Sequence, residues 1–276
     1  MAASYLVLAV VLAVALNHRN RFVRAAGSLI AALGLAMIAV SIVLADFDGT
    51  FAAAPGSGVS AFNPLILNVQ AAVAAVAAAF LVWTAWLQTM REEIQPVALR
   101  NAKAGFGLVS RYAHWITATL MLCLIPIGLF VAVLPAAAPD RAEFLAAHQS
   151  LGLLLLPIAA ARLAWLAASP PPPAAGIKPY ERRLARTVHA GLYGLILGFP
   201  LTGLMMTLDR GEAISFFGLP VGRLVAPDEQ AARLWQTGHD AILPLAFYVL
   251  IFAHVGAVLK HHFADGRRND VRRMLA

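Results

Sequence analysis

The sequence predicts an all-α polytopic membrane protein with about seven transmembrane helices. Of the 276 residues, 61% are hydrophobic and only 13% are charged. Several apolar runs approach about 20 residues, the length that a helix needs to cross a bilayer. A soluble globular protein does not have this composition. The single cysteine, Cys123, lies in one of these runs, so the chain has no disulfide framework.

Seven apolar runs mark the predicted helices, in the order 2–16, 25–45, 63–88, 112–134, 147–168, 187–207 and 240–260. The first run is short and ends in small residues, which also suits a cleaved signal peptide. It has no Lys or Arg at its start, however, and cleavage would place Arg19, Arg21 and Arg24 outside the cell and invert every later connection. We therefore expect the first run to be a helix.

The basic residues indicate how the chain crosses the membrane. The connections after the first, third and fifth runs and the C-terminal end together hold sixteen Lys and Arg, whereas the opposite side holds four Arg and eight acidic residues. By the positive-inside rule, the N-terminus lies outside and the C-terminus lies on the cytoplasmic side of the lipid bilayer. Topology thus explains the net charge of +7, and no nucleic-acid partner is expected.

A change in composition near residue 100 divides the chain into two predicted domains. Residues 1–100 form a three-helix membrane module rich in Ala, Val and Leu, whose helices have no histidine or charge in their cores. We expect this module to serve packing or docking, because nothing in it indicates chemistry. Residues 101–276 form the second domain, a four-helix unit in which every helix carries a histidine near an end.

The histidines of the second domain sort into two membrane levels. His148 and His239 lie toward the periplasmic side, while His114, His189 and His254 lie toward the cytoplasmic side. Fifteen residues separate His239 from His254 on one helix. This spacing places them about 22 Å apart along the helix and roughly 60° apart around its axis. Histidine is costly in hydrocarbon, so each of these side chains is expected to have a partner.

Three explanations compete for these histidines. Zinc or copper sites usually include thiolates or carboxylates, and Cys123 has no evident partner of that kind. Hydrogen bonding between helices explains one such histidine more readily than five on four helices. Haem b needs an imidazole on each face and an apolar slot between helices, and the pattern favours this explanation. On the cytoplasmic side, three histidines remain candidates for one site with two ligands.

Two further residues fit a haem site. Gly152 lies four residues after His148, on the same helix face, where it lets a flat macrocycle approach. Arg162 lies inside a membrane run, near the cytoplasmic end of the fifth predicted helix. Its side chain either reaches the lipid headgroups or holds an anion. A haem propionate is the first candidate for that anion, and a quinone carbonyl is the next candidate partner.

Four segments of the second domain resemble the prokaryotic cytochrome b561 family. They are SRYAHWI at 110–116, AHQSLG at 147–152 followed by ARL at 161–163, His189 with PLTG at 200–203, and His254 with LKHHF at 259–263. The resemblance covers residues 108–276. It rests on several motifs that occur in the right order, since no single motif would suffice.

The resemblance implies a four-helix bundle with two haem b groups, which carries electrons between a periplasmic donor and the quinone pool. Ubiquinone is the expected quinone, and some members of the family oxidise superoxide. Carried over position by position, the resemblance implies that His148 and His239 bind the periplasmic-side haem. It likewise implies that His114 and His254 bind the cytoplasmic-side haem.

Two other histidines have family counterparts. His189 matches a histidine that is not an axial ligand, although the residues alone leave it open as a ligand of the cytoplasmic-side haem. His261 matches a histidine near the quinone end. A position facing lipid headgroups explains His261 equally well, because His262 follows it at the end of the last run.

Two features depart from the family pattern. The spacing from His239 to His254 is one residue longer than usual, and a wide helical turn at Pro244 would absorb the extra residue. The three N-terminal helices have no counterpart in the compact members. They suggest docking into a larger respiratory or photosynthetic membrane complex through residues 1–90.

Three functions stay open at this point. The first is a quinone-linked oxidoreductase that takes electrons from a periplasmic donor. The second is a haem b subunit of a larger complex, and the third is a transporter or scaffold whose histidines bind protons or brace helices. The predicted periplasmic loops are more acidic than basic. They therefore suit a basic donor such as a small cytochrome c better than the superoxide anion.

Overall fold

The structure is a computed structural model, and it describes most of the second predicted domain. The described residues are 98–134 without 104, 141–173, 178–221, 225–265 and 274, together with short stretches between 20 and 36 and between 75 and 86. The described residues from 22 to 36 and from 75 to 86 are helical. Most of the predicted three-helix module lies outside the described residues, so its helix boundaries stay predictions.

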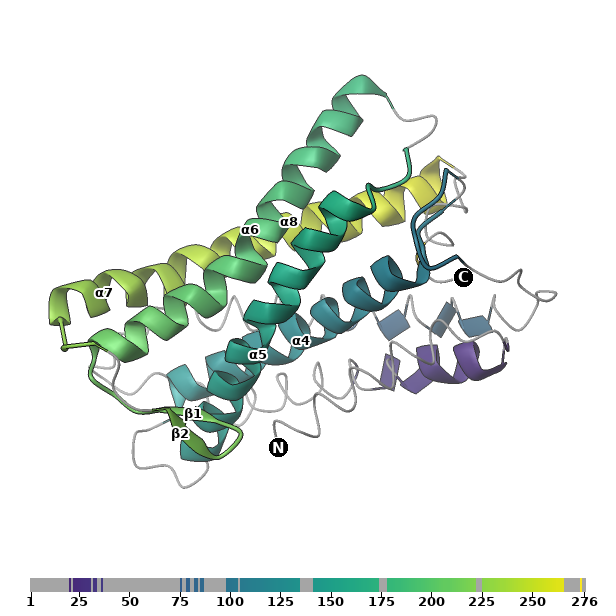
Figure 1. The fold of residues 1–276 in the computed structure, drawn as a ribbon. Helices are drawn as coiled ribbons and strands as arrows, with labels where there is room; N and C mark the ends of the chain where they lie inside the picture. The colour runs from purple at the N-terminus through teal and green to yellow at the C-terminus, as the bar shows by residue number, and fades with distance from the viewer. Residues whose placement is uncertain are drawn as a thin grey trace.

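Four long helices dominate the described part (Figure 1). They are α4 (Leu108–Val133), α5 (Arg141–Ala168), α6 (Pro179–Asp209) and a continuous helix made of α7 (Glu229–Thr237), η1 (Gly238–Ile242) and α8 (Leu243–Leu259). Each is long and apolar enough to cross a membrane. The last four predicted runs are therefore confirmed as helices, and the chain is a multi-pass membrane protein.

Helix α6 begins eight residues before the run at 187–207 predicted from hydropathy, and local sequence explains the extension. Pro179 occupies the first turn, where its missing N–H costs no helical hydrogen bond. The Lys178 amide donates to Glu181 Oε2 at 3.1 Å, which closes the helix start. This first turn is polar, so a search for apolar runs in the sequence does not include it in the helix.

Helix α7 continues the last membrane helix beyond the predicted run at 240–260. Asp228 caps its start, because the carboxylate Oδ1 accepts from the amides of Gln230 and Ala231 at 2.9 and 3.0 Å. The Trp235 indole donates to Asp209 Oδ2 at 3.0 Å, which ties α7 to the end of α6. Asp209 is buried, so this hydrogen bond supplies a partner that its carboxylate needs.

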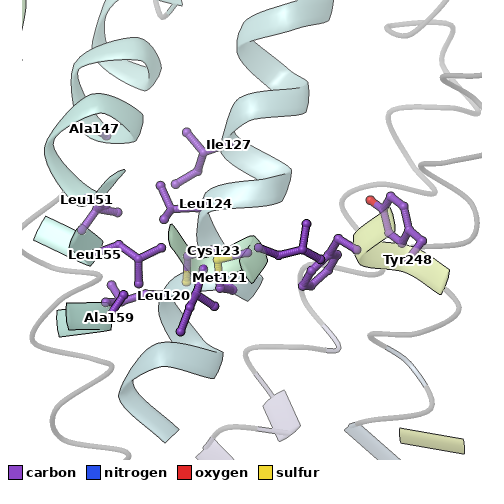
Figure 2. Close-up of a cluster of buried hydrophobic side chains, with 13 residues drawn as sticks. Leu120, Met121, Cys123, Leu124, Ile127, Ala147, Leu151, Leu155, Ala159 and Tyr248 are labelled. Carbon is purple, nitrogen blue, oxygen red and sulfur yellow. The ribbon is translucent and has the colours of Figure 1, made fainter. Parts of the chain in front are cut away.

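The core lies mainly between α4 and α5 (Figure 2). On α5, small and apolar side chains recur every four residues, at 147, 151, 155 and 159, and so form one ridge. Leu120 of α4 and Leu151 and Leu155 of α5 are fully buried. Truncating either α5 leucine to alanine would leave a cavity and cost about 2–5 kcal/mol.

The turn η1 is a π-helix, in which the Leu243 amide bonds to the Gly238 carbonyl five residues earlier. It contains His239 and leads into the regular part of α8, where Pro244 follows near the start. A proline ring clashes with the carbonyl four residues before it, here that of Asp240, and a widened turn relieves that clash. The predicted wide turn is therefore confirmed, just ahead of Pro244.

A short hairpin, which the all-α prediction did not include, follows α6. Strands β1 (Ile214–Phe216) and β2 (Leu219–Val221) pair antiparallel, with Ser215 opposite Pro220. The turn is tight, since Phe217 and Gly218 both have positive φ. Figure 1 places this hairpin beside the first part of α5.

Side chains of α5 satisfy the backbone of the hairpin. The Ser215 amide donates to Gln149 Oε1 at 3.0 Å, and the Phe217 amide donates to Ser150 Oγ at 2.9 Å. Ser150 is almost fully buried beneath the hairpin. Because these two side chains directly follow His148 in α5, the hairpin is fixed next to that histidine.

Candidate functional site

Histidines from different helices face each other at two levels of the bundle. At the end that carries β1 and β2, the rings of His148 (α5) and His239 (η1) have centroids 5.9 Å apart and planes at 88°. Toward the end of α8, the rings of His114 (α4) and His254 (α8) have centroids 6.3 Å apart and planes at 45°. We call these the hairpin-end pair and the C-terminal-end pair.

Both pairs join helices that are not packing neighbours. Helix α5 packs against both α4 and α6, and α6 packs against α8, whereas α8 does not pack closely along α4 or α5. The hairpin-end pair joins α5 to η1, and the C-terminal-end pair joins α4 to α8. Histidines thus meet where helix backbones stay apart, which is the arrangement that a flat group between two imidazoles requires.

The ring distances fit an iron with two axial imidazoles. Metal–nitrogen bonds of about 2.0–2.1 Å on opposite sides of one ion put the two ring centroids roughly 6 Å apart. The hairpin-end and C-terminal-end pairs match this separation. His189 lies closer to His254, with centroids 5.2 Å apart and planes at 77°, and its side chain is exposed. This shorter contact is a packing distance and leaves less room for a metal between the rings.

Both rings of the hairpin-end pair have their Nδ1 atoms turned toward oxygens. His148 Nδ1 lies 3.1 Å from the carbonyl oxygen of Leu124, which can only accept, so this nitrogen donates. His239 Nδ1 lies 3.0 Å from Thr202 Oγ1, whose own hydroxyl donates to the Gly198 carbonyl at 2.7 Å. With Nδ1 carrying the proton, Nε2 of each ring keeps the lone pair that a metal needs.

Two glycines make room for the same two rings. A Cβ atom at Gly128 of α4 would lie 2.8 Å from His148 Cε1, and a Cβ at Gly203 of α6 would lie 2.8 Å from His239 Cε1. Real Cβ contacts are not this short, so any larger residue would displace the ring. Each histidine of this pair is therefore held from a neighbouring helix by one hydrogen bond and one glycine.

The C-terminal-end pair has a different environment. Arg162 Nη2 lies 3.2 Å from Nδ1 of His114, and the guanidinium also lies over the Tyr193 ring, 5.1 Å from its centroid. A guanidinium has no acceptor, so His114 Nδ1 accepts this bond and the neutral ring carries its proton on Nε2. Binding of a metal through Nε2 therefore requires that His114 release Arg162 and move its proton to Nδ1. The predicted functional arginine is thus brought to the predicted histidine, in direct contact with it.

The number of protein ligands also distinguishes haem from other metal sites. Within the part of the chain that the structure describes, no group of three or more His, Cys, Asp or Glu side chains is placed to hold a metal ion. A structural zinc site takes four protein ligands and a catalytic zinc site takes three, whereas a haem iron with two axial ligands takes two imidazoles. The two histidine pairs fit the latter requirement.

Gly152 has open space beside it, as the sequence suggested. A Cβ atom built there meets no heavy atom within 4 Å, although the residue itself is not exposed. Gly152 follows His148 by one helical turn, so this space lies beside the hairpin-end pair. A planar group therefore has room on the face of α5 that carries Gly152, whereas the face that carries Leu151 is filled by the core.

His261 belongs to a polar cluster in η2 (Lys260–Ala264). His261 Nδ1 lies 2.7 Å from Asp265 Oδ2, and Lys260 Nζ lies 2.8 Å from Glu181 Oε1 and 3.0 Å from Asp265 Oδ2. The hydrogen bonds from His261 and then from Lys260 lower the pKa of the Asp265 carboxyl. The cluster joins the end of α8 to the start of α6, away from the two histidine pairs.

Three residues at the hairpin-end pair were not predicted from the sequence. Thr202 and Gly203 lie in the PLTG segment that carries the family resemblance, but their contacts with His239 follow only from the packing of α6 against η1. Gly128 has no distinguishing signal, because glycine is common in apolar helices. Its role becomes visible only once α4 and α5 are placed together.

Comparison with known proteins agrees with this arrangement. A family model described as prokaryotic cytochrome b561 matches residues 105–276, which is more than half of the chain. Cytochrome b561 homolog 2 of Escherichia coli is 28% identical over 180 residues, covering 65% of this chain and 95% of that protein. Cytochrome b561 homolog 1 of the same organism is 32% identical over 106 residues, covering 38% of this chain and 56% of that protein. The chain belongs to the prokaryotic cytochrome b561 family.

Proposed function

We propose that this protein is a di-haem b cytochrome that passes electrons between a periplasmic donor and the quinone pool of the bacterial inner membrane. In this proposal His148 and His239 bind the iron of one haem, and His114 and His254 bind the iron of the other. The hairpin end then faces the periplasm, and the C-terminal end faces the cytoplasm. The N-terminus lies in the periplasm, as the distribution of basic residues predicts.

The observation that carries the proposal is the distance between the two imidazole rings within each histidine pair. Their ring centroids lie 5.9 and 6.3 Å apart, close to what two imidazoles on one iron require. Each pair draws its members from different helices, and the two pairs lie at opposite ends of α8. Family membership independently supports haem b as the group that these histidines hold.

A haem whose iron has two axial imidazoles takes up and releases one electron without binding a substrate at the metal. Hydrogen bonds from neighbouring helices fix the imidazole rings of His148 and His239, and apolar helices surround them. Arg162 supplies a half-buried cation at the C-terminal-end pair, where it suits a propionate or a quinone carbonyl. Gly152 leaves the space beside α5 that a macrocycle would occupy.

The donor is assigned from charge. Around the hairpin end, the exposed residues Glu212, Asp228, Glu229 and Asp240 outnumber Arg210 and Arg233. A surface with this excess of carboxylates attracts a basic protein such as a small cytochrome c. Superoxide is an anion and is repelled by the same surface, so we rank it as the second candidate donor.

The quinone, with ubiquinone as the expected type, is assigned to the cytoplasmic half. Arg162 and His189 lie on α5 and α6 near His254, and His261 lies beyond the end of α8. His189 is an exposed residue whose ring contacts His254, and in this proposal its ring offers a hydrogen bond to the quinone. His261 is engaged with Asp265 and would reach a quinone only through that pair.

A second candidate function is that of a haem b subunit in a larger respiratory or photosynthetic complex. The family match begins at residue 105, so the chain carries a long N-terminal part beyond the matched domain. In this alternative, residues 1–90 form the docking surface. Purification from native membranes in mild detergent tests it, since a docked subunit is recovered with fixed partners and an independent cytochrome is recovered alone.

A reduced-minus-oxidised spectrum of the purified protein tests the main proposal. We expect two haem b groups in the wild type and one in each of His148→Ala and His254→Ala. His189→Ala is the matched control, since it removes a histidine that contacts His254 but is not assigned as a ligand, and it should keep both. A colourless wild type, or unchanged haem content in both ligand variants, would reject the proposal and favour a transporter or scaffold.

A further inference from the structure

We propose that Thr202 and Gly203 of α6 act together as a positioning device for His239, and that Thr202 sets the reduction potential of the haem at the hairpin-end pair. This inference rests on the proposed function. It adds two residues that are not ligands themselves and act through the imidazole that they contact.

The first step of the argument is the position of His239. This residue lies in the π-helical turn η1, where one extra residue is accommodated and the regular hydrogen-bond ladder is interrupted. Regular helix geometry therefore does not fix the direction of its ring. Contacts from another element must do so, and α6 supplies them.

The second step is the contact with Thr202. Its hydroxyl donates back to the Gly198 carbonyl at 2.7 Å, and the Phe199 carbonyl lies 3.0 Å away as an alternative acceptor. With its proton committed to the helix backbone, Oγ1 presents a lone pair to His239 Nδ1 at 3.0 Å. Thr202 thus specifies that His239 carries its proton on Nδ1 and leaves the lone pair on Nε2.

The third step is the contact with Gly203. The His239 ring lies against the backbone of α6, and a Cβ at position 203 would approach Cε1 to 2.8 Å. The ring of Phe199 covers another side, with centroids 5.8 Å apart and planes at 85°. The imidazole is therefore confined from two sides and oriented by one hydrogen bond.

The electronic consequence follows from that hydrogen bond. An acceptor on Nδ1–H makes an imidazole a stronger electron donor through Nε2 and so stabilises ferric iron more than ferrous iron. Removing the acceptor raises the reduction potential.

Redox titration of Thr202→Val tests the proposal, and the chain offers a close control in Thr207. Thr207 lies on the same helix and makes the same kind of bond, from Oγ1 to the Gly203 carbonyl at 2.9 Å, with no contact to a histidine. Titrations are performed on the haem-loaded protein in a His254→Ala background, in which the hairpin-end haem alone is expected. The spectrum of each variant reports haem content independently of any electron-transfer activity.

We expect Thr202→Val to raise the midpoint potential by about 30 mV, which corresponds to about a threefold change in the ratio of reduced to oxidised haem for a one-electron couple. Thr207→Val should leave the potential unchanged, and Thr202→Ser should restore the wild-type value because it keeps Oγ. The positioning role would also be supported if Thr202→Val lost the hairpin-end haem while Thr207→Val and Thr202→Ser both kept it.

Two outcomes would overturn the inference and separate it from the proposed function. If Thr202→Val and Thr207→Val have the same potential and the same haem content, Thr202 does not position His239, even though His239→Ala removes one haem. If His239→Ala itself leaves haem content unchanged, the ligand assignment fails and the role of Thr202 fails with it. Gly203→Ala provides a second test, since it should remove the hairpin-end haem through steric contact alone.

Discussion

The imidazole planes of His148 and His239 lie at 88° to each other, whereas those of His114 and His254 lie at 45°. The hairpin-end rings are fixed by different helices: α4 holds His148 through Leu124, and α6 holds His239 through Thr202. The angle between them therefore depends on how these helices pack. The two pairs therefore differ in geometry as well as in their level along the bundle.

Electron paramagnetic resonance should distinguish the two sites in the oxidised protein. The relative orientation of two axial imidazole planes sets the energies of the iron d orbitals that hold the unpaired electron. We expect two low-spin signals, the more anisotropic one from the nearly perpendicular hairpin-end pair. His148→Ala should remove that signal and His254→Ala the other. A single signal that neither substitution alters would contradict the assignment.

Gly128→Ala should remove the hairpin-end haem. The added Cβ would lie 2.8 Å from His148 Cε1, so the ring must leave its position and break its bond to the Leu124 carbonyl. Gly198→Ala is the matched control, because its Cβ would meet only Leu243 side-chain atoms, the nearest at 3.6 Å. Haem content per protein is the measurement. Retention of both haems in Gly128→Ala would show that His148 has more freedom than this packing allows.

Deletion of Ala241 should keep both haems, although it restores the contact of the Pro244 ring with the preceding turn and so lowers the stability of the helix. The residue lies in the π-helical turn, and its removal lets the chain close a regular α-helical turn while the flanking segments keep their orientation. Deletion of Ala246 from the regular helix α8 should instead turn one side of the helix by about 100° relative to the other and separate the histidines from their partners. The haem content of the two deletion variants is the measurement that compares them. Equal loss in both deletions would mean that the wide turn itself is required.

Arg162→Gln should lower the reduction potential of the haem at the C-terminal-end pair. The guanidinium lies 3.2 Å from His114, and a nearby cation favours the reduced state, which carries one more electron. We expect a change of about threefold to tenfold in the ratio of reduced to oxidised haem, or about 30–60 mV. Arg183→Gln, at an exposed position on α6, should have no such effect. An unchanged potential in Arg162→Gln would place the cation away from the haem in the loaded protein.

The polar cluster at η2 should hold the end of α8 to the start of α6 only over a middle range of pH. Hydrogen bonds to Glu181 and Asp265 raise the pKa of Lys260 above its ordinary value of 10.5, so its contribution is lost as pH rises through that raised pKa. The pKa of Asp265 is lowered below 3.8, so its contribution is present above that value and lost as pH falls through the lowered pKa. The contact is therefore strongest from about pH 4 to pH 10.

Spin-label distance measurements between positions 180 and 263, both exposed, test this expectation. The labels are attached to introduced cysteines in a Cys123→Ala background. The distance distribution should be narrow near neutral pH and broaden at both extremes. Lys260→Ala should already give a broad distribution at neutral pH. A distribution that depends on neither pH nor Lys260 would show that helix packing alone holds these ends together.

The sequence predicted the large-scale organisation because the physical signals for it are strong and local. Twenty apolar residues in a row specify a membrane helix with little dependence on neighbours, so the last four runs were placed correctly. Sorting His148 with His239, and His254 with the C-terminal-end group, needed only the direction of each helix. Whether His114 or His189 faces His254 at metal-binding distance depended on helix rotation, which hydropathy does not encode.

The contacts around the ligands could not be read from the sequence for the same reason. Gly128 and Gly203 act on histidines of other helices, so their role depends on the tertiary arrangement. The hairpin at 214–221 is apolar and short, and it resembles the end of a membrane run more than a β-structure. The early start of α6 at Pro179 was missed because its first turns are polar and amphipathic rather than apolar.

The attachment of the hairpin to α5 has a mechanical consequence. Gln149 and Ser150, which grip the backbone of β1 and the turn, are the two residues that follow His148. A force applied to this loop is therefore transmitted through these hydrogen bonds to the residues that follow His148. A protein that docked on the hairpin would therefore press on the helical turn that carries His148, and so would change the position of its imidazole.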